Sequence, residues 1–155
     1  MACQPPLRLV LDTNTVMALW FFEDPALARL GRLLDETRPI LITRADALEE
    51  LRRVLAYRQF GIDAPRQDAI LSAYSARATL VATLSPASES TIPGAALPAC
   101  RDSDDQKFLE IARDGGATHL VSRDKALLRL GRHRLIRPLF AILSPEALVA
   151  SLPPG

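Results

Sequence analysis

The sequence predicts a three-layer α/β protein in which a central parallel sheet of about five strands is flanked by helices. Short apolar runs alternate along the chain with stretches of helical periodicity, and Gly and Pro residues separate many of them. A length of 155 residues suits one domain, and a hydrophobic content of 48% predicts a packed core. We therefore expect one domain over residues 1–155, with frayed ends at 1–6 and 152–155.

The expected elements follow in order from these patterns. Apolar runs predict strands at 8–11, 40–42, 80–83, 118–121 and 139–143. Helical periodicity and capping residues predict helices at about 15–22, 25–36, 44–57, 65–78, 104–114, 125–130 and from 145 onward. Thr43 and Ser144 are expected helix caps, and Gly115-Gly116 is an expected helix end. Residues 84–99 contain three prolines and predict a loop.

The net charge of +1 argues against a uniformly basic nucleic-acid-binding protein. An acidic site with a basic rim remains compatible with that balance. The only cysteines, Cys3 and Cys100, lack metal-ligand spacing, which favours a reduced protein. We expect a cytoplasmic protein, because the sequence shows no secretory leader and no apolar run of membrane-spanning length.

Two aspartates stand where a predicted strand ends. Asp12 follows Leu9-Val10-Leu11, and Asp124 comes shortly after Leu120-Val121. The carboxyl ends of strands form the ligand crevice of an open α/β sheet. Carboxylates gathered there would bind a hard divalent cation such as Mg²⁺, which commonly acts on phosphates. The simpler alternative for each aspartate is an ordinary helix cap.

A glutamate pair in the third predicted helix requires a choice. On a helical projection, Glu50 falls about 110° from the centre of the apolar stripe and Glu49 about 150°. Glu50 therefore flanks the buried face and could reach a cleft, whereas Glu49 points to water. Both could instead belong to a solvated face with ion pairs to Arg52 or Arg53.

Three acids, Asp102, Asp104 and Asp105, lie within four residues. Ser103 and Gln106 have the spacing of a capping box, which would place Asp105 in the first helical turn. The helix dipole favours one or two acids there. The mutual repulsion of three acids would be relieved by a bound cation or by exposure to water.

Taken together, these motifs resemble a PIN domain, and the nearest branch is the one assigned to toxin components of toxin–antitoxin systems. The resemblance covers nearly the whole chain. It rests on Leu11-Asp12-Thr13-Asn14, on the Glu50-Leu51-Arg52-Arg53 segment, on the acidic stretch from Arg101 to Ala112, and on Leu120-Val121-Ser122-Arg123-Asp124.

The resemblance implies a set of site residues. The acidic quartet of the family falls on Asp12, Glu50, Asp105 and Asp124. The family spacing selects Asp105 over Asp104. Further implied residues are the polar helpers Asn14 and Ser122 and an accessory acid at Asp102. Two positions depart from the branch: Ser103 replaces a frequent Pro, and Gln106 replaces a frequent acid.

The implied activity is that of a ribonuclease using one or two Mg²⁺ or Mn²⁺ ions. Separately, basic residues cluster between Arg123 and Arg137, and we expect Arg123, Lys125 and Arg129 to contact the RNA backbone; a solvated helix face is the simpler alternative. A cognate antitoxin and a homodimer are implied partners. Two alternatives remain open. The segment from Asp12 to Val16 partly resembles the haloacid-dehalogenase phosphatase signature, which requires Asp where Asn14 stands. A non-catalytic PIN-like module that binds RNA or protein is the other.

Overall fold

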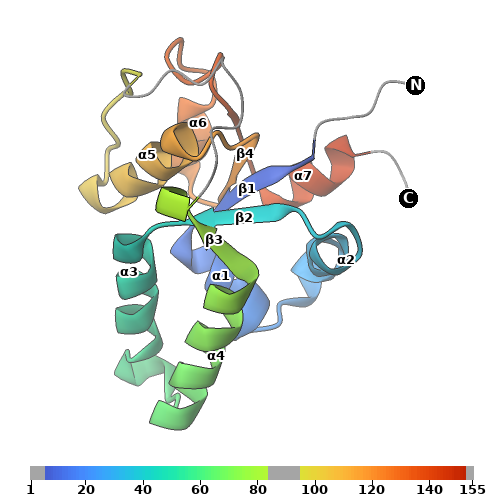
Figure 1. The fold of residues 1–155 in the computed structure, drawn as a ribbon, viewed down its shortest axis with the longest axis vertical. Helices are drawn as coiled ribbons and strands as arrows, with labels where there is room; N and C mark the ends of the chain where they lie inside the picture. Colours follow the sequence, from blue (N-terminus) through green and yellow to red (C-terminus); the bar gives the residue numbers. More distant parts are fainter. Residues whose placement is uncertain (1–5, 84–94, 153–155) are drawn as a thin grey trace.

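A five-stranded parallel sheet forms the centre of the protein (Figure 1). The computed structural model describes residues 6–83 and 95–152. The strand order is β3-β2-β1-β4-β5. The strands are β1 (Arg8–Leu11), β2 (Ile40–Thr43), β3 (Ala78–Leu80), β4 (His119–Val121) and β5 (Ala141–Leu143).

Seven helices and several short 3₁₀ turns are found in the described residues. The helices are α1 (Thr13–Trp20), α2 (Ala28–Thr37), α3 (Ala45–Leu55), α4 (Ala64–Arg77), α5 (Gln106–Asp114), α6 (Lys125–Leu130) and α7 (Pro145–Ser151). The turns are η1 (Pro25–Leu27), η2 (Arg58–Phe60), η3 (Val81–Thr83) and η4 (Ser103–Asp105). Among these residues, no helix combines the length and apolar character that crossing a membrane requires.

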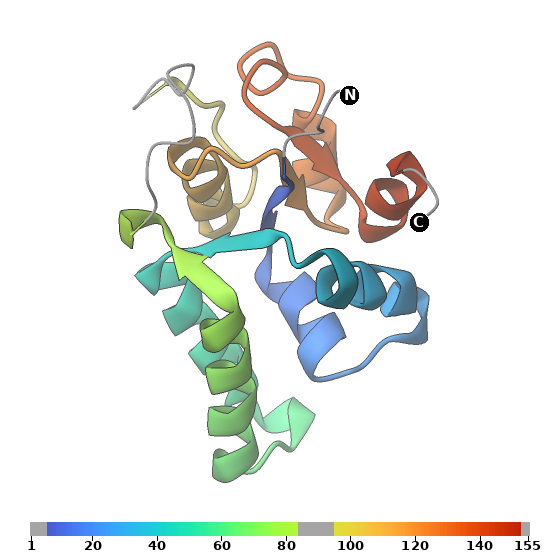
Figure 2. The same cartoon turned by 45° about the vertical axis from the view of Figure 1, so that its right-hand side comes forward.

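Alternating side chains of the strands divide the core between the two faces of the sheet. Leu9 and Leu11 of β1 pack with buried residues of α1 to α4 and α7, whereas Val10 packs with those of α5 and α6. The helices therefore form one layer on each side of the sheet, as the two views show (Figures 1 and 2). This arrangement confirms the predicted three-layer fold and parallel sheet.

The order of the strands creates a topological switch point between β1 and β4. The chain leaves β1 toward β2 on one side and later returns to β4 on the other. Leu11 of β1 pairs in register with Val121 of β4. The residues that follow these strands, Asp12 and Ser122, therefore emerge side by side at the switch point where α/β sheets bind ligands.

Two predicted strands differ from the structure by at least two residues at one end. The third was expected at 80–83, but β3 covers Ala78–Leu80 and the next three residues form η3. The last was expected at 139–143, but β5 begins only at Ala141. Phe140 instead donates its backbone N–H to the carbonyl of Ile136, and both side chains are buried. An apolar run can thus fill the core from a turn as well as from a strand.

Two predicted helix caps are wrong. Thr43 ends β2 and is buried, so Arg44 occupies the position before α3. Ser103 does not cap α5 either: Asp102 accepts from the backbone N–H of Asp104 at 2.9 Å and opens η4. Such aspartate turns compete directly with a capping box. Residues 1–5 and 153–155 of the predicted frayed ends, and residues 84–94 of the predicted loop, lie outside the described residues.

Candidate metal centre

Asp12 lies at the carboxyl end of β1 and is almost fully buried, with an exposed fraction of 5%. Its Oδ1 accepts from the backbone N–H of Thr15 at 2.9 Å and from the Thr15 hydroxyl at 2.5 Å. Its Oδ2 accepts from the hydroxyl of Ser122 at 2.6 Å. Burial raises the pKa of Asp12, and these hydrogen bonds oppose that rise. Asp12 thus caps α1 while its carboxylate is held in one orientation.

Ser122 and Asp124 form the matching end of β4. Ser122 is fully buried, donates to Asp12, and accepts from the backbone N–H of Asp124 at 2.9 Å. Asp124 caps α6 through Oδ2, which accepts from the backbone N–H of Leu127 at 2.9 Å. The described residues provide no donor for its other oxygen, so the cap leaves one carboxylate oxygen available.

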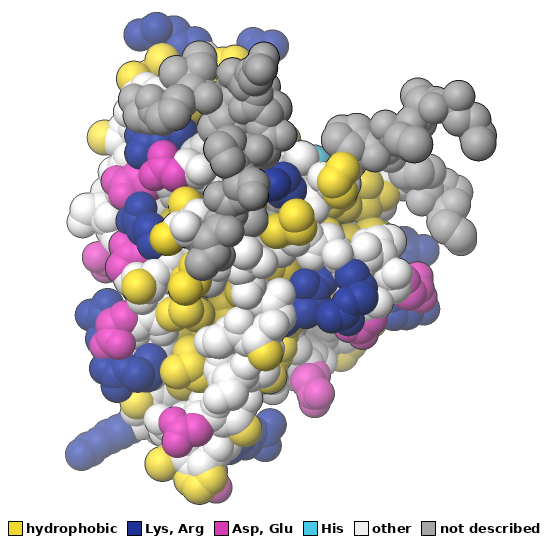
Figure 3. Space-filling model, viewed as in Figure 1, with side chains coloured by type: hydrophobic (Ala, Val, Ile, Leu, Met, Phe, Trp, Pro, Cys, Tyr) yellow, Lys and Arg dark blue, Asp and Glu magenta, His cyan; other side chains and the backbone are white. Residues whose placement is uncertain are grey.

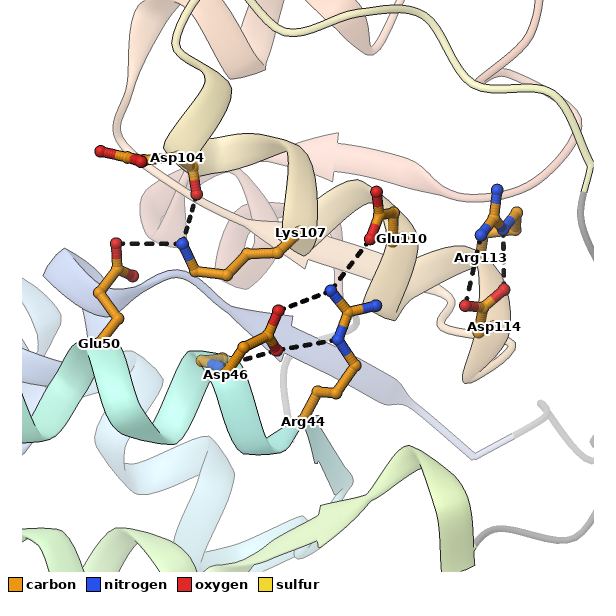
Figure 4. Close-up of polar contacts among 9 residues, drawn as sticks. Arg44, Asp46, Glu50, Asp104, Lys107, Glu110, Arg113 and Asp114 are labelled. Atoms are coloured by element: carbon orange, nitrogen blue, oxygen red, sulfur yellow. Dashed lines mark hydrogen bonds and ion pairs between the residues drawn. The ribbon is translucent and has the colours of Figure 1, made fainter.

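Glu50 reaches the same region from α3. Its Oε2 accepts from the hydroxyl of Thr13, and its Oε1 lies 3.2 Å from Nζ of Lys107 on α5 (Figure 4). The side chain of Glu50 is only 19% exposed. Glu49 is exposed and pairs with Arg52 one turn further along the helix. The two neighbouring glutamates therefore differ as the helical projection suggests.

Asp105 shows that the acids influence one another. It lies in η4, immediately before α5, and is partly buried. Burial, with the charges of Asp102, Asp124, Asp12 and Glu50, raises the pKa of Asp105 from 3.8 to about 6. Within the described part of the chain, its carboxylate accepts no hydrogen bond. A positive charge beside Asp105 would relieve this repulsion.

Cys100 belongs to the same neighbourhood, which its position in the sequence did not suggest. Burial and the charges of Asp105, Asp124 and Asp102 raise the pKa of the Cys100 thiol to about 11. The thiol therefore stays protonated at neutral pH and is a poor metal ligand or nucleophile in that form. Asp102 is exposed and borders the cluster while capping η4.

Oxygen donors of several elements are thus gathered at one sheet edge. In residues 6–83 and 95–152, however, no three acidic, histidine or cysteine side chains already surround a common point as in a finished metal site. The donor set is nevertheless of the hard, anionic type that Mg²⁺ and Mn²⁺ take. The chemistry of these residues therefore fits such an ion.

Sequence reasoning missed three side chains that hold the acids in place. They are Thr13, Thr15 and Lys107. A threonine three residues after an N-cap aspartate is a local pattern, so Thr15 could have been found from the sequence. Asn14, by contrast, is exposed and forms no hydrogen bond with Asp12 in the structure. It lines a cavity instead.

That cavity has a volume of about 600 Å³, and its wall includes Thr15, whose hydroxyl donates to Asp12. Asn14, which also lines it, lies two residues after Asp12, and Arg123 directly precedes Asp124. It is lined by Asn14, Thr15, Ala18, Phe22, Asp24, Pro25 and Arg123. A space of this volume can accommodate a small organic group such as a nucleotide unit.

The three basic residues expected to contact RNA differ in whether they already form ion pairs. Arg123 is paired with Asp24 at 2.9 Å and with Glu146 at 2.7 Å. Lys125 and Arg129 are exposed on α6. Arg123 would therefore have to leave its acidic partners to contact a phosphate, whereas the two α6 residues would not.

The protein is therefore an α/β protein whose carboxylates are gathered at the carboxyl ends of its parallel strands. The PIN domain family model matches residues 8–126, more than half of the chain. The chain therefore belongs to the PIN domain family, whose members are generally metal-dependent nucleases. Comparisons with curated proteins and with solved structures found no match.

Proposed function

We propose that this protein is a Mg²⁺- or Mn²⁺-dependent endoribonuclease and the toxin component of a toxin–antitoxin system. The observation that carries the proposal is the gathering of four acids at the carboxyl edge of the sheet. Burial raises the pKa of Asp105, and the nearby charges of Asp102, Asp124, Asp12 and Glu50 raise it further. Such electrostatic crowding in a crevice is typical of functional sites.

Asp12, Asp105 and Asp124 are the proposed ligands of a divalent ion, with Asp102 as an accessory. Glu50 would either help hold a second ion or orient the attacking water. When bound, the ion supplies a lowered pKa for that water and stabilisation of charge on the phosphoryl oxygens. The alternatives for Glu50 have different consequences for the number of ions bound.

The surrounding hydroxyl groups have a separate role in this proposal. Ser122 and Thr15 fix the rotamer of Asp12, and Thr13 fixes that of Glu50. Carboxylates that are already held in place before the substrate binds need less reorganisation during the reaction. These residues are therefore positioning residues and need not touch the RNA.

RNA binding would rely on local positive charge near the site. On the face seen in Figure 3, Lys and Arg side chains are interspersed with Asp and Glu side chains. Lys125 and Arg129, exposed on the helix that follows Asp124, are the proposed contacts to the RNA backbone. Arg123 is a further proposed contact once its acidic partners are displaced.

The toxin role and the homodimer are proposals based on the resemblance of this chain to the toxin branch. A cognate antitoxin would inhibit the enzyme by covering or entering the acidic cleft. Its natural setting would then be the cytoplasm, where RNA is available. A small neighbouring gene that encodes a DNA-binding antitoxin would support this role, and light scattering of the purified protein would measure its oligomeric state.

The ribonuclease proposal is tested with purified protein and a labelled mixed-sequence RNA. Cleavage is expected with Mn²⁺ or Mg²⁺ and not with EDTA. Asp12→Asn and Asp105→Asn should each lower the rate by at least about 100-fold without unfolding the protein. If wild type cuts no RNA and the variants bind metal as well as wild type, a non-catalytic binding module becomes the better account.

A further inference from the structure

The geometry points to Lys107 as a built-in cation that occupies the place of a second metal ion. The site would then take a single divalent ion through its aspartates, and Glu50 would be held by protein donors rather than by metal. This inference rests on the proposed function and decides between the two roles left open for Glu50. It makes Lys107 a positioning residue for that glutamate.

Lys107 is confined at three points. Its Nζ lies 3.2 Å from Oε1 of Glu50 and also donates to the backbone carbonyl of Asp104 (Figure 4). The ammonium also lies 5.2 Å from the centre of the Phe108 ring, within cation–π range. Its side chain is only 15% exposed. This confinement differs from an ordinary surface lysine, which samples many rotamers in water.

Both carboxylate oxygens of Glu50 are engaged. Oε2 accepts from Thr13, at the start of α1, and Oε1 faces Lys107, in α5. An ion bound by Glu50 would lie within a few ångströms of the ammonium, and the repulsion between a double and a single positive charge at that distance is large. A second ion and Lys107 at its observed position therefore exclude each other.

Linking α3 to α5 does not by itself explain the Lys107–Glu50 ion pair. A second ion pair, between Arg44 and Glu110, already links these helices at 3.0 Å (Figure 4). Its side chains are more exposed, at 31% and 37%. Glu50 also accepts from the hydroxyl of Thr13, the residue directly after Asp12, whereas the described side-chain contacts of Glu110 reach only Arg44. Of the two bridges, only Lys107–Glu50 faces the acidic centre.

The test counts Mn²⁺ ions bound to the metal-free protein by electron paramagnetic resonance titration. Wild type and Lys107→Arg should bind one ion. Lys107→Met keeps the length of the side chain without its charge and should admit a second ion. Two Mn²⁺ ions about 4 Å apart would add dipolar coupling to the spectrum. Adding Glu50→Gln to Lys107→Met should return the count to one.

Glu110→Gln is the matched control, because it breaks the other α3–α5 bridge and should leave the count at one. Two ions bound to wild type would overturn the inference, and RNA cleavage by that same protein would leave the proposed function intact. A count of one in Lys107→Met would also overturn it, provided that circular dichroism shows a folded variant. Should Lys107→Met fail to fold, the wild-type count alone decides. No bound Mn²⁺ and no cleavage would defeat both proposals.

Discussion

Replacing Asp105 with Asn is expected to stabilise the metal-free protein at neutral pH. The pKa of Asp105 is raised from 3.8 to about 6 by burial and by neighbouring carboxylates. The folded protein therefore binds this proton more tightly than the unfolded chain, and ionisation favours unfolding. The penalty is absent below about pH 3.8, grows up to about pH 6, and is complete above it.

The size of this effect follows from the shift. A rise of about 2 pKa units corresponds to about 3 kcal/mol in the free energy of unfolding. Because Asp105 is only partly buried, solvent screens its interactions, and we reduce the value to about 1–2 kcal/mol. In a domain of this length, the gain corresponds to a rise in Tm of about 2–8 °C. About a third of this gain in the free energy of unfolding should remain near pH 4.5.

Urea unfolding followed by circular dichroism, in EDTA at about pH 7.5 and 4.5, measures this difference. The matched control is Asp104→Asn. Asp104 is exposed and is not among the charges that raise the pKa of Asp105, so its removal should change stability by less than about 0.5 kcal/mol. An Asp105→Asn variant no more stable than wild type at pH 7.5, or a gain of equal size at both pH values, would refute the reasoning.

Three further predictions follow from the same contacts. Ser122→Ala should lower the free energy of unfolding by about 2–3 kcal/mol, because a buried bond to the Asp12 carboxylate is lost; an unchanged urea midpoint would argue against this. The affinity for Mn²⁺, measured by calorimetry, should fall about tenfold per pH unit below about pH 6, because the proposed ligand Asp105 is protonated there. An affinity that does not change with pH would contradict that role. Phe22→Ala should raise KM for RNA about fivefold, because base stacking on Phe22 is lost. Tyr57 is similarly exposed but lies outside the cavity, so Tyr57→Ala should leave KM unchanged. Equal effects of the two substitutions would show that RNA does not bind in the cavity.

The strand ends could be predicted because they depend on local pattern and on one topological rule. The apolar runs before Asp12 and Asp124 identify buried strands, and the carboxyl ends of parallel strands meet at one edge. The orientation of Glu50 relative to Glu49 depends only on helical geometry. These features require no knowledge of how distant segments pack.

The contacts that hold the acids could not be predicted in the same way. Lys107 and Glu50 are 57 residues apart, and their pairing depends on how α3 and α5 approach each other from opposite faces of the sheet. The capping box failed for a related reason. Gln106 donates to the carbonyl of Pro98 and accepts from the backbone N–H of Cys100, so tertiary contacts replaced the local one.

The central claim is that the gathered carboxylates direct water onto an RNA phosphodiester. Cleavage in H₂¹⁸O with Mn²⁺, followed by mass spectrometry of the products, tests it most directly. Water attack should place one ¹⁸O on the new terminal phosphate, and Asp12→Asn should abolish that product. A 2′,3′-cyclic phosphate without ¹⁸O would mean that the RNA hydroxyl is the nucleophile and would contradict the claim.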